Sequence, residues 1–123
     1  MSRIKPGEMT VDQLVDRFMG LALEQDHALL GNEIAKVNRL YDQLKDIEAE
    51  LKARPGDQRR ALLGLYSHPN PQVRLKAVMG TLAVAPEVAR QMLHQIAKSR
   101  ENPQALDAGM SIRALERGIF KPS

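Results

Sequence analysis

The sequence predicts an all-α protein, a helical solenoid of about six helices in three antiparallel pairs. Three observations support this prediction: apolar residues recur every three or four positions, residues 55–117 contain an internal repeat of 31–32 residues, and prolines and polar caps mark several helix starts. The 123 residues suffice for one domain. Because aromatic residues make up only 3% of the chain, we expect a core of aliphatic side chains.

The first helix is expected to begin after Thr10 and to end near Leu29 or Leu30. Thr10 and Gln13 have the spacing of a capping box, in which each side chain bonds the other residue's backbone N–H. Gly31 is expected to supply the left-handed residue that ends the helix. The apolar positions that form the buried stripe are Val11, Leu14, Val15, Phe18, Met19 and Ala22.

A second helix is expected to follow, with Asn32 as its N-cap, and to end before the pair Arg54-Pro55, since a residue before proline disfavours the helical conformation. The two helices form a capping hairpin over residues 10–54, preceded by a flexible N-terminal tail over residues 1–9. The stripe that faces the first helix comprises Ile34, Val37, Tyr41, Leu44, Ile47 and Leu51.

The repeat consists of residues 55–85 and 86–117, each predicted as helix, short loop and helix. Pro55 aligns with Pro86 at an offset of 31, and after one extra loop residue the segment 70–72 aligns with 102–104 at an offset of 32. Asn70 and Asn102 are expected to cap the second helix of each unit. The apolar positions of the two repeat units include Met79, Met92 and Met110, which the spacing places in the core.

Residues 118–123 are expected to form a C-terminal tail. A solenoid needs a cap at its last helix, because each unit buries its apolar face only against a neighbour. Either Ile119 and Phe120 fold back onto that helix, or a second subunit covers it. The sequence thus leaves a homodimer as one expectation.

The segment 68–74, HPNPQVR, followed by Ala77 and Leu82, resembles the HEAT-repeat consensus. Residues 86–117 match it weakly, since Ala105 and Leu106 stand where the consensus has Val-Arg. Taken whole, the chain resembles a family of small bacterial proteins with HEAT/armadillo-like repeats, classed as a domain of unknown function. The resemblance implies a right-handed solenoid fragment and a structural role for Arg74, and it implies no activity.

The sequence argues against catalysis and against cofactors. The chain has no cysteine, which excludes disulfides and thiol nucleophiles, and it contains neither a glycine-rich phosphate loop nor a nucleophile elbow. The histidines His27, His68 and His94 lack metal-ligand spacing. No apolar run approaches the length of a membrane span, and the start of the chain does not resemble a signal peptide, so we expect a cytoplasmic protein.

Basic residues are concentrated toward the C-terminal half. The net charge is +3, and residues 55–123 carry ten Lys or Arg against five Asp or Glu. A stacked solenoid would gather some of these cations on a concave face, where they could contact DNA phosphates. The residues expected on such a basic binding face are Arg59, Arg60, Arg74, Lys76 and Arg113.

Two functions follow as hypotheses. The first is a non-catalytic protein–protein interaction module whose partner the sequence does not identify, because solenoids present extended, rigid binding surfaces. The alternative is a module that binds the DNA backbone through the basic face. Few aromatic residues are available for stacking, which disfavours RNA and single-stranded nucleic acid.

Overall fold

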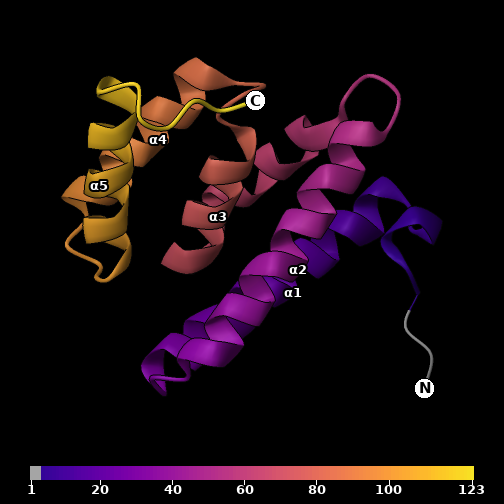
Figure 1. Cartoon of the computed structure of the whole chain (residues 1–123), viewed down its shortest axis with the longest axis horizontal. Helices are drawn as coiled ribbons and strands as arrows, with labels where there is room; N and C mark the ends of the chain where they lie inside the picture. Colours follow the sequence, from indigo (N-terminus) through magenta and orange to yellow (C-terminus); the bar gives the residue numbers. More distant parts are fainter. Residues whose placement is uncertain (1–3) are drawn as a thin grey trace. The chain divides into compact units, whose positions relative to one another are not determined.

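The computed structural model describes residues 4–123, and within this range every regular element is a helix, with no strand. The prediction of an all-α protein is therefore confirmed (Figure 1). Five α-helices and two 3₁₀-helices follow one another as η1 (Pro6–Glu8), α1 (Val11–Leu30), α2 (Ile34–Ala53), η2 (Gln58–Ser67), α3 (Pro71–Thr81), α4 (Pro86–Lys98) and α5 (Gln104–Glu116).

The chain divides into two compact units, of which the first ends at Ala61 and the second comprises Leu62–Ser123. Unit 1 contains η1, α1 and α2, and unit 2 contains α3, α4 and α5. The division falls within η2, and thus inside the predicted repeat unit of residues 55–85. Each unit is described by itself below.

The start of α1 is as predicted. The Thr10 hydroxyl oxygen accepts a hydrogen bond from the Gln13 backbone N–H at 3.1 Å, and the Gln13 side-chain oxygen accepts one from the Thr10 N–H at 2.9 Å. This capping box is confirmed.

The turn after α1 differs from the prediction. Gly31 has a φ of −87°, whereas Asn32 has a φ of 56° and takes the left-handed conformation. Asn tolerates this conformation because its short polar side chain adds little steric conflict. Glu33 then takes the N-cap position that was predicted for Asn32.

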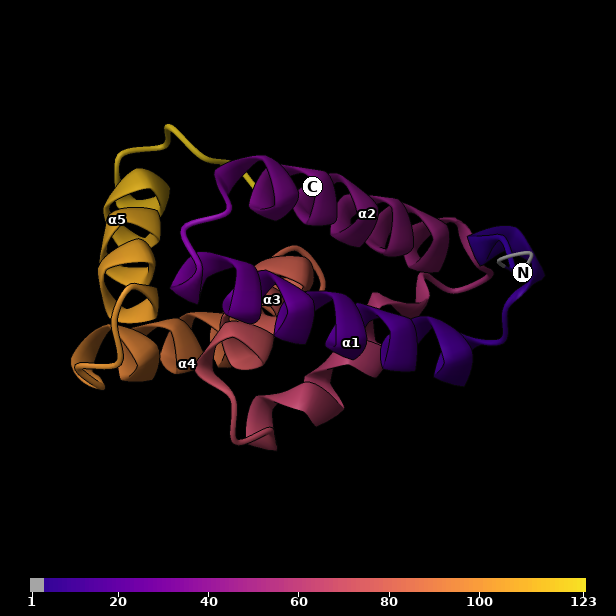
Figure 2. The same ribbon diagram turned by 90° about the horizontal axis from the view of Figure 1, so that it is seen from below.

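The two helices of unit 1 pack side by side along their length (Figures 1 and 2). The predicted stripe of α2 is wrong at two positions, since Ile34 is 56% exposed and Tyr41 is 42% exposed. The buried stripe instead runs through Leu40, one residue before Tyr41, because positions spaced by four, three and four residues face one side of the helix. The buried side chains of the pair include Leu14, Phe18, Leu21, Leu40, Leu44, Ile47 and Leu51.

The described part of the predicted N-terminal tail, residues 4–9, is held against the end of α2. Arg54 donates hydrogen bonds from Nη2 to the carbonyl oxygens of Pro6 at 3.1 Å and Met9 at 2.6 Å, and its Nε bonds Glu50 at 2.6 Å. Met9 is buried as a result. Residues 1–3 lie outside the described range.

The first helix of the repeat is a 3₁₀-helix, η2, where an ordinary helix was expected. Its buried residues Leu62 and Leu65 are three positions apart, which matches the three-residue turn of a 3₁₀-helix. Gly64 between them lowers the propensity for an α-helix.

Helix starts in unit 2 follow the prediction in two of three cases. The Asn70 side chain accepts hydrogen bonds from the backbone N–H groups of Gln72 and Val73, so it caps α3, and proline occupies the first turn of both α3 and α4. Asn102 does not cap α5, because Pro103 takes the N-cap position and has no side-chain acceptor.

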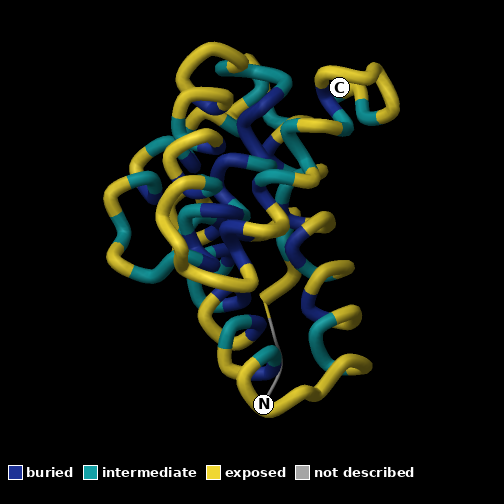
Figure 3. The backbone as a smooth tube through the Cα atoms, turned by 90° about the vertical axis from the view of Figure 1, so that its left-hand side faces the viewer, coloured by how far each residue is buried: buried dark blue, intermediate teal, exposed yellow. Residues whose placement is uncertain are grey.

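The core of unit 2 is aliphatic and draws on α3, α4 and α5. Figure 3 shows buried segments alternating with exposed ones along the helices. Phe120 packs against the core, and its backbone N–H bonds the Ala114 carbonyl oxygen, whereas Ile119 is 75% exposed. The expected fold-back of the C-terminal residues is thus confirmed for Phe120 only. The buried cluster comprises Leu75, Val78, Leu82, Ala89, Leu93, Ile96, Ala108 and Leu115.

A buried hydrogen bond joins α3 to α5. The Gln104 side-chain Nε2 donates to the Gln72 Oε1 at 2.7 Å, and the two residues are 2% and 3% exposed. They are equivalent positions of the repeat, since the offset of 32 aligns them. An amide pair away from water is costly to break, so it ties the register of the two helices together.

We predict that Gln104→Leu lowers the free energy of unfolding by about 1–3 kcal/mol, because the Gln72 oxygen loses this donor in a buried site. The double variant Gln72→Leu with Gln104→Leu should recover part of that loss, since neither side of this hydrogen bond is then left without the other. Urea titration of the single and double variants measures the coupling. Gln91→Leu, at an exposed position of α4, is the matched control. If the single and double variants lose the same free energy of unfolding, the result would contradict the pairing.

We also predict that Arg54→Ala destabilises the protein by about 1–3 kcal/mol, because the carbonyl oxygens of Pro6 and Met9 lose their donor. Hydrogen exchange should show faster exchange in the segment around Met9. Arg39→Ala, an exposed residue of the same helix, should change stability by less than about 0.5 kcal/mol. An Arg54 variant as stable as the Arg39 variant would show that the N-terminal segment is not held in this way.

Candidate functional site

Arg59, one of the residues predicted on a basic face, is engaged within unit 1. Its Nε and Nη2 bond the two carboxylate oxygens of Asp57 at 2.9 and 2.7 Å, and its side chain is 11% exposed. The hydrogen bonds from Arg59 lower the pKa of Asp57 from 3.8 to about 2, and the same contact raises the pKa of Arg59. Arg59 therefore offers little of its charge to a ligand.

Arg74 is also paired, through its Nη2, with the Glu101 carboxylate at 2.9 Å. Glu101 lies in the loop before α5, so the acid comes from the second predicted repeat unit. The structural role that the HEAT resemblance implies for Arg74 agrees with this contact. However, its Nε is buried and has no hydrogen-bond partner among the described residues.

The other predicted basic residues differ in exposure. Arg60 and Arg113 are exposed, and Lys76 is half-buried on α3. Arg59 and Arg60 belong to unit 1, whereas Arg74, Lys76 and Arg113 belong to unit 2. The five predicted residues are therefore divided between the two units.

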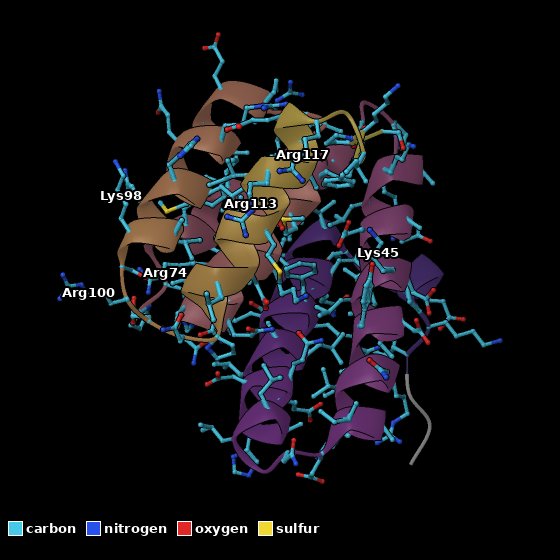
Figure 4. The ribbon with its side chains drawn as sticks, turned by 60° about the vertical axis from the view of Figure 1, so that its left-hand side comes forward. Lys45, Arg74, Lys98, Arg100, Arg113 and Arg117 are labelled. Atoms are coloured by element: carbon cyan, nitrogen blue, oxygen red, sulfur yellow. The ribbon has the colours of Figure 1, made fainter. Side chains whose placement is uncertain are left out.

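The outer face of α5 carries an apolar and basic stripe that the sequence reasoning missed. Leu106 is 66% exposed and Met110 is 56% exposed, although Met110 was predicted in the core. Arg113 and Arg117 continue the stripe at spacings of three and four residues and are exposed. Figure 4 shows both arginines on the side of α5 that faces the viewer. We call Leu106, Met110, Arg113 and Arg117 the α5 stripe.

The α5 stripe lies opposite the face of the helix that packs into unit 2. The buried positions of α5 are Gln104, Ala105, Ala108 and Leu115, and a period of 3.6 residues puts the stripe on the other side. The helical spacing of two apolar and two basic residues could have revealed it. The prediction failed for Met110 because the spacing of apolar positions alone does not show which face of a helix is buried.

Unit 1 contains a cavity of about 480 Å³. It lies between the N-terminal segment, α1 and α2, and its lining combines the cations Lys5 and Arg17 with the acids Glu24 and Asp46. Charges of both signs balance there, so the lining selects no charge class of ligand.

Residues 4–123 hold no group of three or more His, Asp or Glu side chains placed to bind a metal ion. Over the same range, none of the helices combines the length and apolar character required to traverse a bilayer. His68 lies in the loop between η2 and α3, where its Nδ1 accepts a hydrogen bond from the Asn70 backbone N–H at 3.0 Å.

A protein-family model described as "Domain of unknown function (DUF2019)" matches residues 12–116. The chain belongs to this family. The expected resemblance to a domain of unknown function is confirmed, whereas the HEAT/armadillo class stays a prediction. The sequence matches no curated protein.

Among solved structures, the crystal structure of the protein RPA1889 from Rhodopseudomonas palustris CGA009 is similar. It shares 50% sequence identity, and the match covers 98% of this chain and 100% of that one with a TM-score of 0.93. The family fold is thus shared by both proteins over almost their full lengths.

The pairing of Arg59 with Asp57 can be tested by pH. We predict that the Asp57 carboxylate titrates with a pKa of about 2, and that Arg59→Gln returns the value toward 3.8. Because the folded pKa lies below the unfolded one, the pairing stabilises the protein fully above pH 3.8 and is lost as the pH falls toward 2. NMR titration of the side-chain carboxyl carbon measures this directly.

Arg60→Gln is the matched control and should leave the Asp57 titration unchanged. If Arg59→Gln leaves the pKa of Asp57 unchanged, Arg59 is not held by Asp57 and is free to bind elsewhere.

Proposed function

We propose that this protein is a non-catalytic protein–protein interaction module whose α5 stripe binds an acidic amphipathic helix of a partner. The observation that carries the proposal is the exposure of Leu106 and Met110 on a helix face that also presents Arg113 and Arg117. Two large apolar side chains, one turn apart, match the i and i+4 anchors by which helices dock on one another.

The chemistry of the α5 stripe favours a protein over a small molecule. A flat helix face gives little enclosure to a small ligand, but it can pack along another helix. Met adapts its shape to a partner surface, and arginine is enriched where interfaces concentrate their binding energy. Arg113 and Arg117 would select a partner with carboxylates beside its apolar residues, by complementarity of charge.

The scaffold of the proposed module is a HEAT-like, right-handed solenoid fragment of antiparallel helix pairs. Two features support this proposal. The repeat-equivalent residues Gln72 and Gln104 bond each other, as stacked units would require, and α3 also contacts α5. Such a scaffold presents its helices as rigid rods, which lowers the entropic cost of binding.

We further propose that the protein acts in the cytoplasm and without a cofactor. The absence of cysteine and of phosphate-binding motifs in the sequence supports this proposal.

DNA-backbone binding is the second candidate, and the exposed cations of unit 2 favour it. Unit 2 carries eight Lys or Arg against four Asp or Glu. Lys98, Arg100, Arg113 and Arg117 are exposed and have no ion pair within residues 4–123 (Figure 4). Phosphate binding would weaken steeply with salt, because each contact releases counterions.

Site-specific photocrosslinking tests the proposed interface. A photoreactive residue at position 110 should capture a protein segment with acidic and apolar residues at helical spacing. The same residue at position 34, an exposed site on α2, is the matched control and should capture nothing at this yield. Leu106→Ser with Met110→Ser should weaken binding of the captured segment by about tenfold or more, since buried anchors carry most interface energy.

The outcomes separate the candidates. Crosslinks from position 110 to a second copy of this chain would show that the α5 stripe forms a homodimer and does not bind a different protein. The mass of the protein in solution would confirm the dimer. Binding of duplex DNA that falls steeply with salt and survives the double serine variant would favour the backbone-binding alternative. Crosslinking equal at positions 110 and 34 would contradict the proposed surface.

A further inference from the structure

Unit 2 contains a second candidate site, which lies away from the residues of the α5 stripe. It is a cavity of about 380 Å³ between the end of η2, the loop that follows it, α3 and α4. Its lining includes His68, Arg74 and Gln95 and no acidic residue. These polar residues therefore offer hydrogen-bond donors to a ligand and no carboxylate.

Arg74 supplies the charge of this cavity. Its Nη2 bonds Glu101, which does not line the cavity, while its Nε is buried without a hydrogen-bond partner among the described residues. A buried guanidinium N–H that lacks an acceptor has lost its hydrogen bonds to water, and no hydrogen bond within the protein compensates for that loss. Arg74 lines the cavity, so an acceptor oxygen bound there would lie beside its guanidinium.

His68 adds a second donor. Its Nδ1 accepts a hydrogen bond from the Asn70 backbone N–H at 3.0 Å, so the proton of the neutral ring sits on Nε2. Nε2 has no hydrogen-bond partner within residues 4–123. The Gln95 amide, also without a partner in this range, can donate from the opposite wall on α4.

Apolar side chains complete the lining. Pro69 lies in the loop, and Met92 and Ile96 lie on α4 one turn apart. A ligand that fits this lining needs an anionic head for Arg74 and His68 and an apolar body for α4.

We propose that this cavity binds a carboxylate attached to an apolar carbon skeleton. A carboxylate has the planar shape that an arginine fork recognises. Arg74 is the single charged residue among those that line the cavity, and it already shares its charge with Glu101, so a monoanion fits better than a phosphate dianion. The carboxylate comes either from a free small molecule or from the C-terminus of a peptide.

Benzoate is the probe for the first test, with benzamide as its uncharged counterpart. In ¹⁵N-labelled protein, the Arg74 Nε–H signal and the His68 ring signals should shift saturably on addition of benzoate, with a Kd of about 1 mM for so small a ligand. Benzamide should cause no saturable shift at these signals. Equal shifts by both compounds, or no shift of Arg74 and His68 with benzoate, would overturn the proposal.

Variants then test which side chains bind the carboxylate. Arg74→Lys keeps the charge but removes the planar fork, and it should raise the Kd for benzoate about tenfold. Arg90→Lys, at an exposed position of α4 outside the cavity lining, is the matched control and should leave the Kd unchanged. Glu101→Gln removes the competing carboxylate from Arg74, and binding should tighten about threefold. Unchanged affinity in both the Arg74 and Glu101 variants would overturn the assignment even if one variant folded poorly.

A pair of tetrapeptides ending in leucine distinguishes the two possible sources of the carboxylate, a free small molecule and a peptide C-terminus. If a peptide C-terminus is the natural ligand, the peptide with a free carboxylate should bind at least about tenfold more tightly than benzoate, and the amidated peptide should not bind. If the free peptide binds no better than benzoate, the ligand is a small carboxylate. An amidated peptide that binds as well as the free one would contradict carboxylate recognition.

Discussion

The hydrogen bond between Gln72 and Gln104 is the constraint on which unit 2 depends. Both side chains are almost fully buried, so neither amide can exchange this bond for water without opening the core. A one-residue rotation of α5 would break the bond and expose the apolar face that Ala108 and Leu115 bury. The pair and these buried apolar residues favour the same orientation of α5, which leaves the face with Leu106 and Met110 to solvent.

Arg74 connects the packing of unit 2 to its surface chemistry. The guanidinium reaches Glu101 with one nitrogen and leaves another buried without a partner beside a cavity. A contact that serves stability alone would be expected to satisfy every buried donor. This unsatisfied donor supports the proposal that Arg74 also contacts a ligand.

The candidate sites could be predicted from the sequence only in part. Arg74 was predicted as a binding residue from its place in the repeat, but Arg59 was not free, because Asp57 two residues earlier accepts hydrogen bonds from its Nε and Nη2. Met110 was placed in the core by its helical spacing and is exposed. Charge and spacing identify which side chains have the required chemistry. Pairing and exposure, which select among them, depend on neighbours that the linear pattern does not reveal.

Local interactions explain what the sequence by itself determined. The capping box at Thr10, the Asn70 cap and the end of α2 before Pro55 follow from residues within a few positions of one another. The tertiary structure alone decided that Arg54 holds the N-terminal segment and that the α5 stripe faces solvent. The physical reason is that burial is a property of packing between distant segments, whereas caps and proline breaks are properties of the local backbone.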